Sequence, residues 1–566
     1  MSLKSQTGHS TDTDNGFDST GSIDLSLFGS NAPATLVGAA PSAVQPTPSV
    51  MQAAEALTFN NFSAVSAALP SAAVATTTTK TTTTTTTPIT TSTSTSTVSS
   101  TPSLPSWIKS LSTASIETDM AAADVNGTVS YAGLLKVFND LDAKLGSTKL
   151  TAAEMADLKT IAANLNNGLS TSSYLTGITQ SLVNGNKANA TWTGGGASAV
   201  TLGNLATGSS ATQLSELTGK WFMGTDLPSS KVSMDGTNFS VSYSTSSKPL
   251  FSSSGPSMND INQGYLGDCY LLSSLAEVAK QNSGDITSMF TSNGNNTYGV
   301  RLYVNGTADY VTVNSSLANG GNIFNQGGSD IWASLAEKAY AQLQASGVVT
   351  GNSINSGNSW STIGNGGAPE MALEEITGAS AITDFYAGGS SWSKEVYNQS
   401  FGVTGYNTGN STSSVLSTLA TDLAAGDDVI LSSSTNARDS SGKTTLVADH
   451  AMSIYGYDNK TGMLEVRNPW GTETGQTWDT TFEVSLSTLL SDHDTITVDN
   501  AGQAAKTAST STGSVTTKVG AASTSLSAAA SGFVQAISSI SSAGLAAAGL
   551  SQTASSSQAT LASPLA

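Results

Sequence analysis

The sequence contains one cysteine and three histidines among its 566 residues, so few side chains are available for nucleophilic catalysis. Cys269 follows a glycine-containing stretch, residues 263–268, and begins an apolar stretch that ends near Ala279. The apolar residues of that stretch recur at helical spacing, which places Cys269 in the first turn of a predicted helix. Unpaired N–H groups and the positive end of the helix dipole favour a thiolate there. We therefore predict that Cys269 is a nucleophile with an acidified thiol.

The residues just before Cys269 are predicted to support this chemistry. Gln263 lies upstream, where its side-chain amide can point back toward the sulfur and bind an oxyanion. Gly264 and Gly267 permit a sharp turn of the backbone. Gly267 and Asp268 are predicted to support the site. The alternative interpretation is an inert buried thiol, which is the commoner fate of an isolated cysteine.

A general base is predicted from the positions of the three histidines. His9 lies in a polar N-terminal stretch and His493 lies between two aspartates, whereas His450 begins a strand-like stretch. Residues 458–462 have the composition of a hairpin turn, and residues 463–467 form the returning strand. His450 is therefore the histidine with a defined structural setting.

The same hairpin brings Asn468 to the end of the sheet at which His450 lies. An Asn side-chain carbonyl that accepts from one imidazole nitrogen fixes the ring and leaves the other nitrogen for a thiol. Cys269, His450 and Asn468 thus have the residue types of a Cys–His–Asn triad. Trp470 is predicted to shield the bond between Asn468 and His450 from water, which strengthens that bond.

These segments resemble the catalytic core of calpain-type cysteine proteases. The nucleophile segment has Tyr270 where that family usually has Trp, which keeps an aromatic residue at the position. The resemblance extends over roughly residues 225–500. The matching segments are residues 263–272 (Gln-Gly-x-x-Gly-Asp-Cys), 332–341 (Leu-x-Glu-Lys-Ala-Tyr), 450–453 (His-Ala-x-Ser), 468–471 (Asn-Pro-Trp-Gly) and, less closely, 366–373.

The resemblance implies an α+β fold with a papain-like, two-lobed cysteine protease core. Residues 225–378 have mainly helical patterns and would form the lobe that carries Cys269. Residues 379–500 have mainly strand patterns and would form the β-sheet lobe that carries His450 and Asn468. A protein or peptide substrate would lie in the cleft between the lobes. We predict a calpain-like cysteine endopeptidase that works through a thioester acyl-enzyme.

Two other functions fit part of the same pattern. A transglutaminase or an amidase also uses a Cys and His pair, but these enzymes usually have Asp where Asn468 stands. A binding or scaffold protein on an inactive protease fold is the second alternative. The presence of all four chemical positions, Gln263 included, favours an active enzyme.

Calcium is a cofactor that the resemblance implies, because cations align the two lobes in calpains. The acidic residues available for such a role are Glu370, Glu374, Glu375 and Asp458. No ligand spacing in the sequence identifies a site, so the metal ligands are unknown at this stage.

Composition excludes several classes of partner. The net charge of −19 argues against nucleic acid, because binding the phosphate backbone needs clustered Lys and Arg. A single cysteine excludes an intramolecular disulfide framework. No uninterrupted apolar stretch reaches the roughly 20 residues that a membrane helix needs.

Shifts in composition divide the rest of the chain. Residues 1–106 are rich in Ser, Thr and Ala and are predicted to be a disordered arm and linker. Residues 107–220 are predicted to form a small helical domain that inhibits the protease intramolecularly. Residues 501–566 form an Ala/Ser-rich tail, interpreted as an export signal, with a weak helix that packs on the core or remains disordered as the alternative. We expect secretion by a non-Sec route, with a cytoplasmic location as the alternative.

One segment of the helical region resembles a calcium-binding loop. Residues 124–130 carry oxygen ligands around a glycine, as in the middle of an EF-hand. The first and twelfth ligand positions are occupied by Ala122 and Gly133, which cannot supply side-chain oxygens. We therefore predict a structural turn between helices.

Overall fold

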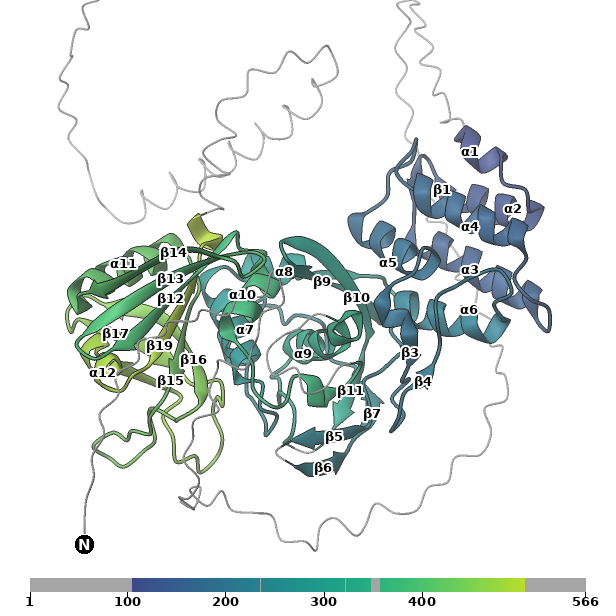
Figure 1. Cartoon of the computed structure of the whole chain (residues 1–566). Helices are drawn as coiled ribbons and strands as arrows, with labels where there is room; N and C mark the ends of the chain where they lie inside the picture. Colours follow the sequence, from purple (N-terminus) through teal and green to yellow (C-terminus); the bar gives the residue numbers. More distant parts are fainter. Residues whose placement is uncertain (1–103, 235, 321, 348–356, 504–566) are drawn as a thin grey trace, which may run out of the picture. The chain divides into compact units, whose positions relative to one another are not determined.

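The computed structural model describes residues 104–234, 236–320, 322–347 and 357–503 (Figure 1). Nearly all of the arm predicted over residues 1–106, and nearly all of the tail predicted over residues 501–566, lie outside the described residues. The described chain contains both helices and antiparallel strands, mostly in runs of one kind, and each hydrophobic core draws on several of them. The predicted α+β class is therefore confirmed.

The first described region is built mainly from helices around one hydrophobic core. A capping box is present at the start of α4: the Thr151 side chain accepts from the Glu154 N–H and the Glu154 carboxylate accepts from the Thr151 N–H. This arrangement satisfies two N–H groups that a helix start leaves unpaired. The helices are α1 (Ser106–Lys109), α2 (Ala114–Ala123), α3 (Tyr131–Leu145), α4 (Ala152–Asn164), α5 (Ser173–Val183) and α6 (Ala211–Thr218).

The segment that resembles a calcium-binding loop is a tight hairpin between α2 and α3. Its strands are β1 (Asp124–Val125) and β2 (Thr128–Val129). The Asp124 carboxylate accepts a hydrogen bond from the Gly127 N–H at 2.8 Å. Gly127 has a φ of 81°, a left-handed conformation that glycine adopts without strain. The predicted structural turn is confirmed.

The second region surrounds the helix that begins at Cys269. Its core joins this helix to α9 and α10 and to a three-stranded sheet of order β10-β9-β8. The elements are β5 (Lys231–Met234), β6 (Thr237–Ser240), β7 (Ser242–Thr245), α7 (Cys269–Gln281), α8 (Ser283–Met289), β8 (Phe290–Ser292), β9 (Thr297–Val304), β10 (Thr307–Asn314), β11 (Ser316–Asn319), α9 (Trp332–Leu343) and α10 (Pro369–Thr377). The predicted helix from Cys269 to about Ala279 is confirmed by α7.

The third region is an eight-stranded antiparallel sheet of order β14-β13-β12-β19-β15-β16-β17-β18 with its own core. The predicted hairpin is confirmed by β16 and β17, which pair Ser453 with Arg467 near the open end and Asp458 with Met463 next to the turn. The elements are β12 (Ala381–Gly388), β13 (Ser391–Asn398), β14 (Val403–Asn410), α11 (Thr412–Ala425), β15 (Val429–Ser433), β16 (His450–Asp458), β17 (Met463–Arg467), β18 (Thr481–Val484), α12 (Leu486–Ser491) and β19 (Thr495–Asp499).

Helix α7 packs along strand β16, and this contact joins the second region to the third (Figure 1). The Ser453 hydroxyl donates to the Ser273 carbonyl at 2.8 Å, and both residues are buried. Two residues far apart in the sequence, Cys269 and His450, begin these two elements and therefore come together.

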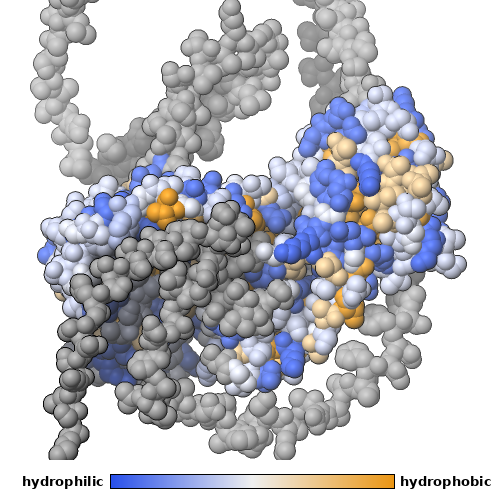
Figure 2. Space-filling model, in the orientation of Figure 1, coloured by the Kyte–Doolittle hydropathy of each residue, from blue (hydrophilic) through white to orange (hydrophobic). Residues whose placement is uncertain are grey.

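On the face of the described chain that Figure 2 shows, hydrophobic residues form separate patches among hydrophilic ones. None of the helices in the described ranges has the length and hydropathy that a membrane crossing requires.

Candidate active site

Cys269 is the first residue of α7, and its sulfur accepts a backbone hydrogen bond from the neighbouring strand β16. The donor is the N–H of Ala451, the residue after His450, at 3.4 Å. This bond and the backbone N–H groups at the helix start lower the pKa of the thiol. Backbone donors in this position are suited to stabilise a thiolate.

His450 is held by Asn468 through a buried hydrogen bond. The distance from His450 Nε2 to Asn468 Oδ1 is 3.0 Å, and the exposed fractions of the two residues are 7% and 0%. Asn468 Oδ1 also accepts from the Trp470 N–H at 3.0 Å, which identifies that atom as the amide oxygen. His450 Nε2 must then carry the proton. The lone pair of Nδ1 is left free to accept a proton from a thiol.

Trp470 covers the bond between His450 and Asn468. Its ring centroid lies 4.9 Å from that of His450, and Trp478 packs edge-on against Trp470 at 5.5 Å. These indoles limit the access of water to the imidazole, so the prediction that Trp470 shields the bond agrees with its position.

Burial sets the protonation states of the cysteine and the histidine. It raises the pKa of the Cys269 thiol to about 11, although nearby backbone N–H groups oppose the shift. It lowers the pKa of His450 to about 4. The pair is therefore a neutral thiol and a neutral imidazole at pH 7. The prediction of an acidified thiol is wrong for this conformation, because desolvation of the thiolate outweighs the helix N-terminus.

The side-chain amide of Gln263 is engaged away from the sulfur. Its Nε2 donates to the Leu266 carbonyl at 2.8 Å and to Asp268 Oδ1 at 3.2 Å, which uses both of its N–H groups. The Gln263 backbone N–H donates to the Pro469 carbonyl at 2.8 Å, next to Asn468. Gln263 thus links the cysteine segment to the asparagine segment, and an oxyanion role requires its side chain to exchange partners.

The two glycines before Cys269 are needed for close backbone contacts. A Cβ on Gly267 would lie 2.6 Å from the Gly364 carbonyl oxygen, and a Cβ on Gly264 would clash with the Asn322 and Ile323 carbonyl groups. Neither glycine has a positive φ. The chain bends at residues 265–266, between the two glycines, and the space that a side chain would fill is the physical reason for glycine at both positions.

Asp268 lies directly before α7 and is completely buried. Its Oδ1 accepts from Gln263 Nε2 at 3.2 Å, and the carboxyl group of Glu337, from α9, interacts with it electrostatically. We assigned Glu337 no role from the sequence, although it is the Glu of the Leu-x-Glu-Lys-Ala-Tyr segment. That segment was the only sequence signal for it.

His493 does not join the site. It lies exposed in the turn between α12 and β19, where its backbone carbonyl accepts from the Ser434 hydroxyl at 3.0 Å. His9 lies outside the described residues.

The acidic residues considered for calcium are engaged separately. Glu374 Oε1 accepts from the Gly306 N–H, and Asp458 Oδ1 accepts from the Lys460 N–H. Glu375 is buried and bonds Tyr340 instead. Among the residues that the structure describes, no group of three or more His, Cys, Asp or Glu side chains is arranged to hold a metal ion. These residues do not fit one shared calcium ion.

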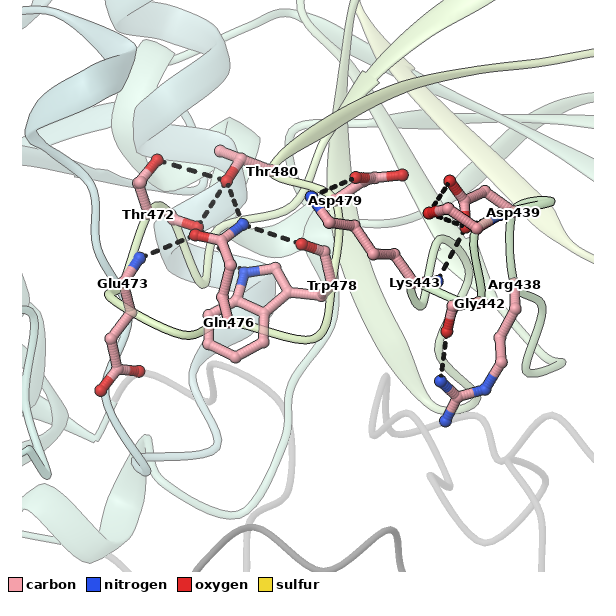
Figure 3. Close-up of polar contacts among 12 residues, drawn as sticks. Arg438, Asp439, Gly442, Lys443, Thr472, Glu473, Gln476, Trp478, Asp479 and Thr480 are labelled. Carbon is pink, nitrogen blue, oxygen red and sulfur yellow. Dashed lines mark hydrogen bonds and ion pairs between the residues drawn. The ribbon is translucent and has the colours of Figure 1, made fainter.

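Two loops extend from the ends of β16 and β17 at which His450 and Asn468 lie, and they are tied together (Figure 3). Lys443 of one loop forms an ion pair with Asp479 of the other at 3.4 Å. The Thr444 N–H donates to the Thr477 carbonyl at 2.9 Å, and the Asp479 N–H donates to the Thr444 carbonyl at 2.8 Å. These bonds make the two loops one connected border beside the site.

Residues 226–488 match the family model described as calpain family cysteine protease. The match is a little under half of the chain and contains Cys269, His450 and Asn468. The chain therefore carries a calpain-family cysteine protease domain, as the motifs predicted, and this domain supports cysteine peptidase activity. A search of curated proteins found no similar sequence.

Proposed function

We propose that this protein is a papain-like, two-lobed cysteine endopeptidase with Cys269, His450 and Asn468 as its triad. One observation carries the proposal. His450 Nε2 is bonded to Asn468 Oδ1 at 3.0 Å, while the N–H of the next residue, Ala451, contacts Cys269 Sγ at 3.4 Å. The cysteine of α7 and the histidine of β16 are thereby adjacent, with the free lone pair on His450 Nδ1.

The chemistry follows from this tautomer. As a substrate carbonyl approaches, His450 Nδ1 takes the thiol proton while the Cys269 sulfur forms a bond to the carbonyl carbon. Nδ1 then gives that proton to the leaving amine as the C–N bond breaks, which leaves a thioester. A water molecule, deprotonated by the same nitrogen, attacks the thioester and releases the acid and the thiol. Asn468 holds the ring in place throughout.

The oxyanion is assigned to the Cys269 N–H and the Gln263 side chain. The Gln263 amide must leave either the Leu266 carbonyl or Asp268, and substrate binding would have to compensate for that lost bond. A donor of this kind contributes on the order of 3 kcal/mol to the transition state.

The triad is tested by the cleavage of an unfolded test protein by purified full-length variants. Cys269→Ala and His450→Ala should abolish cleavage, because one removes the nucleophile and the other the base. Asn468→Ala should reduce it less, since its role is orientation. His493→Ala is the matched control and should retain full activity. Activity that persists in Cys269→Ala, or equal damage by the two histidine substitutions, would show that the assigned roles are wrong.

The same assay separates the alternative enzyme classes. An amidase releases ammonia and a transglutaminase forms new crosslinks between chains, whereas an endopeptidase produces new N-termini. Mass spectrometry of the products identifies which of these bonds is made or broken. An inactive scaffold would give none of them and would not be labelled by a peptide electrophile.

Calcium has no step in this mechanism, because the described carboxylates do not fit one ion. We predict that cleavage in a chelator will be as fast as cleavage in calcium of millimolar order. The measurement is the initial rate in the two buffers, with magnesium as the control for ionic strength. A calcium-specific increase would show instead that the expectation from the family resemblance holds.

A further inference from the structure

Arg467 is the last residue of β17 and lies directly before Asn468. It is 2% exposed, so its charged side chain lies almost entirely away from water. Among the described residues it forms no ion pair, and its Nε and Nη1 atoms have no hydrogen-bond partner there. Burying a guanidinium without a carboxylate partner costs free energy, so stability alone does not explain arginine at this position.

One hydrogen bond ties this side chain to the described part of the chain. Arg467 Nη2 donates to the Ile261 carbonyl at 2.9 Å, and both residues are buried. Ile261 lies two residues before Gln263, in the segment that leads to Cys269. The bond therefore connects the strand before the triad asparagine to the segment of the oxyanion donor, across 206 positions of the sequence.

A second bond joins the same two segments one residue after the triad asparagine. The Gln263 N–H donates to the Pro469 carbonyl at 2.8 Å. The segments also approach closely at Gly471, where a Cβ would lie 3.0 Å from the Ile261 carbonyl oxygen, the atom that Arg467 binds. The two segments are thus held together on both sides of the triad asparagine.

The backbone of this segment is the base from which the Gln263 side chain must move. Its amide nitrogen is engaged by the Leu266 carbonyl and by Asp268 Oδ1, so it reaches an oxyanion only by rotating. A side chain on a fixed backbone has a small set of staggered positions. The placement of the backbone therefore decides what the amide can reach, and a displacement of about 1 Å in such a group can cost about 10²-fold in rate.

We propose that Arg467 is a positioning residue for the oxyanion donor: its bond to the Ile261 carbonyl fixes the backbone from which the Gln263 side chain reaches the substrate. In this role Arg467 acts through Gln263 and takes no part in proton transfer. The effect on turnover rests on the proposed peptidase function, whereas the anchoring of residues 261–263 does not. A purely structural role would lower activity to the same extent with or without the Gln263 amide.

The test measures peptide cleavage by four full-length forms: the original protein, Arg467→Met, Gln263→Ala and the double variant. Met keeps most of the apolar stem and donates no hydrogen bond. Arg467→Met should lower kcat about tenfold to hundredfold with little change in KM when Gln263 is present, and less than about threefold when Gln263 is already Ala. An equal fall in the two backgrounds would overturn the proposal.

Two further comparisons separate the donated bond from packing and from the triad. Because the guanidinium makes a single bond here, one ammonium donor can replace it, and Arg467→Lys should stay within about threefold of the original kcat. In an Asn468→Ala background, Arg467→Met should keep its full effect. Coupling to Asn468 instead of to Gln263, or equal losses in the Lys and Met variants, would overturn the proposal. If Arg467→Met does not fold, Arg467→Gln replaces it in the same series.

The matched control is Arg301→Met, because Arg301 lies on β9 and donates to the Ser288 hydroxyl at 3.2 Å. It should leave kcat unchanged within about twofold. Equal losses in the Arg301 and Arg467 variants would indicate a general response to the loss of an arginine and would count against the proposal.

Hydrogen exchange followed by mass spectrometry gives a readout that needs no activity. The backbone amides of residues 261–268 should exchange about tenfold faster in Arg467→Met and at the original rate in Arg301→Met. Unchanged exchange in Arg467→Met would overturn the anchoring. If the original protein cleaves no peptide, the proposed function fails, while the exchange series still decides whether Arg467 anchors this segment.

Discussion

At the residue scale, burial decides the reactivity of Cys269. Burial raises the thiol pKa to about 11 even though the Ala451 N–H donates to the sulfur and lowers that pKa. The pKa of His450 is lowered to about 4, so the imidazole carries no charge that would stabilise a thiolate. The proton must therefore move during the reaction instead of before it, which distinguishes this conformation from a preformed ion pair.

This protonation state predicts the pH dependence of alkylation. Because a raised pKa means that the thiolate fraction grows until the pH reaches that value, the rate of Cys269 alkylation should rise continuously from about pH 7 to about pH 10. Iodoacetamide labelling without substrate measures it, and the same protein in urea is the control with an ordinary thiol pKa. A plateau reached below neutral pH would show a preformed thiolate and contradict the neutral pair.

Gln263 gives a second prediction at this scale. Its amide contributes to catalysis only if it reaches the oxyanion, and it also links Asp268 to the segment around Pro469. Gln263→Ala should lower kcat by roughly 10²- to 10³-fold with little change in KM. Steady-state kinetics with a peptide substrate measure the two constants. An increase in KM with unchanged kcat would assign Gln263 to substrate binding.

At the scale of elements, the contact between α7 and β16 brings the two halves of the site together. Ser453 of β16 is 1% exposed and donates to the Ser273 carbonyl of α7. Ser453→Ala should lower the free energy of unfolding by about 1 kcal/mol, because a buried hydrogen bond is lost. Urea unfolding measures this change. The control, Ser491→Ala, removes an exposed hydroxyl and should cost less than about 0.5 kcal/mol; equal effects would mean that the buried bond contributes little.

At the scale of the whole described chain, the first helical region packs against the sheet of the second. The Tyr174 hydroxyl is bonded to the Thr312 hydroxyl of β10 at 2.9 Å, and both residues are buried. A Cβ on Gly299 of β9 would clash with the Tyr174 ring. The first region contacts β9, β10 and the short helical turn Gln344–Ser346, whereas Cys269 and His450 begin α7 and β16. Inhibition by residues 107–220 stays a prediction, and these contacts make the region a support for the protease domain.

This packing predicts that the helical region stabilises the catalytic part. Tyr174→Ala should lower the free energy of unfolding by about 3–5 kcal/mol, because it opens a cavity between the two regions. Thermal unfolding followed by circular dichroism reports on the whole fold, and the rate of Cys269 alkylation by iodoacetamide at each temperature reports on the catalytic part. Tyr406→Ala, at a tyrosine that is 65% exposed, is the control and should be nearly neutral. If the alkylation rate of Cys269 keeps its folded-state value while the helical region unfolds, the two regions are stabilised independently.

Deletion of residues 1–220 removes the contact between the helical region and strands β9 and β10. We predicted from the sequence that this deletion raises or preserves activity. The deletion also removes Tyr174 and its buried hydrogen bond to Thr312, so the truncated protein should be less stable. Peptide cleavage and circular dichroism, measured on the same preparation, separate the two effects. Higher activity in a folded truncated protein would establish inhibition, and loss of activity with an intact fold would make the region part of the active architecture.

The sequence by itself determined the local structure around the site. Helical spacing after Cys269 and turn residues after Tyr457 predicted α7 and the hairpin of β16 and β17, because such patterns depend on neighbouring residues. The length of that hairpin also predicted that Asn468 and His450 lie at the same end of it. The residue types then sufficed to indicate the calpain family, whose domain the family comparison found.

Only the tertiary structure decided what the site residues contact and how they titrate. The pKa of Cys269 depends on burial by several elements, which no local pattern encodes. Gly264 and Gly267 are required by the approach of distant backbone segments. The electrostatic interaction of Asp268 with Glu337 exists because α9 packs beside α7. Each of these properties sums interactions between segments that are far apart in the chain, and the distances between such segments are set only when the whole core is packed.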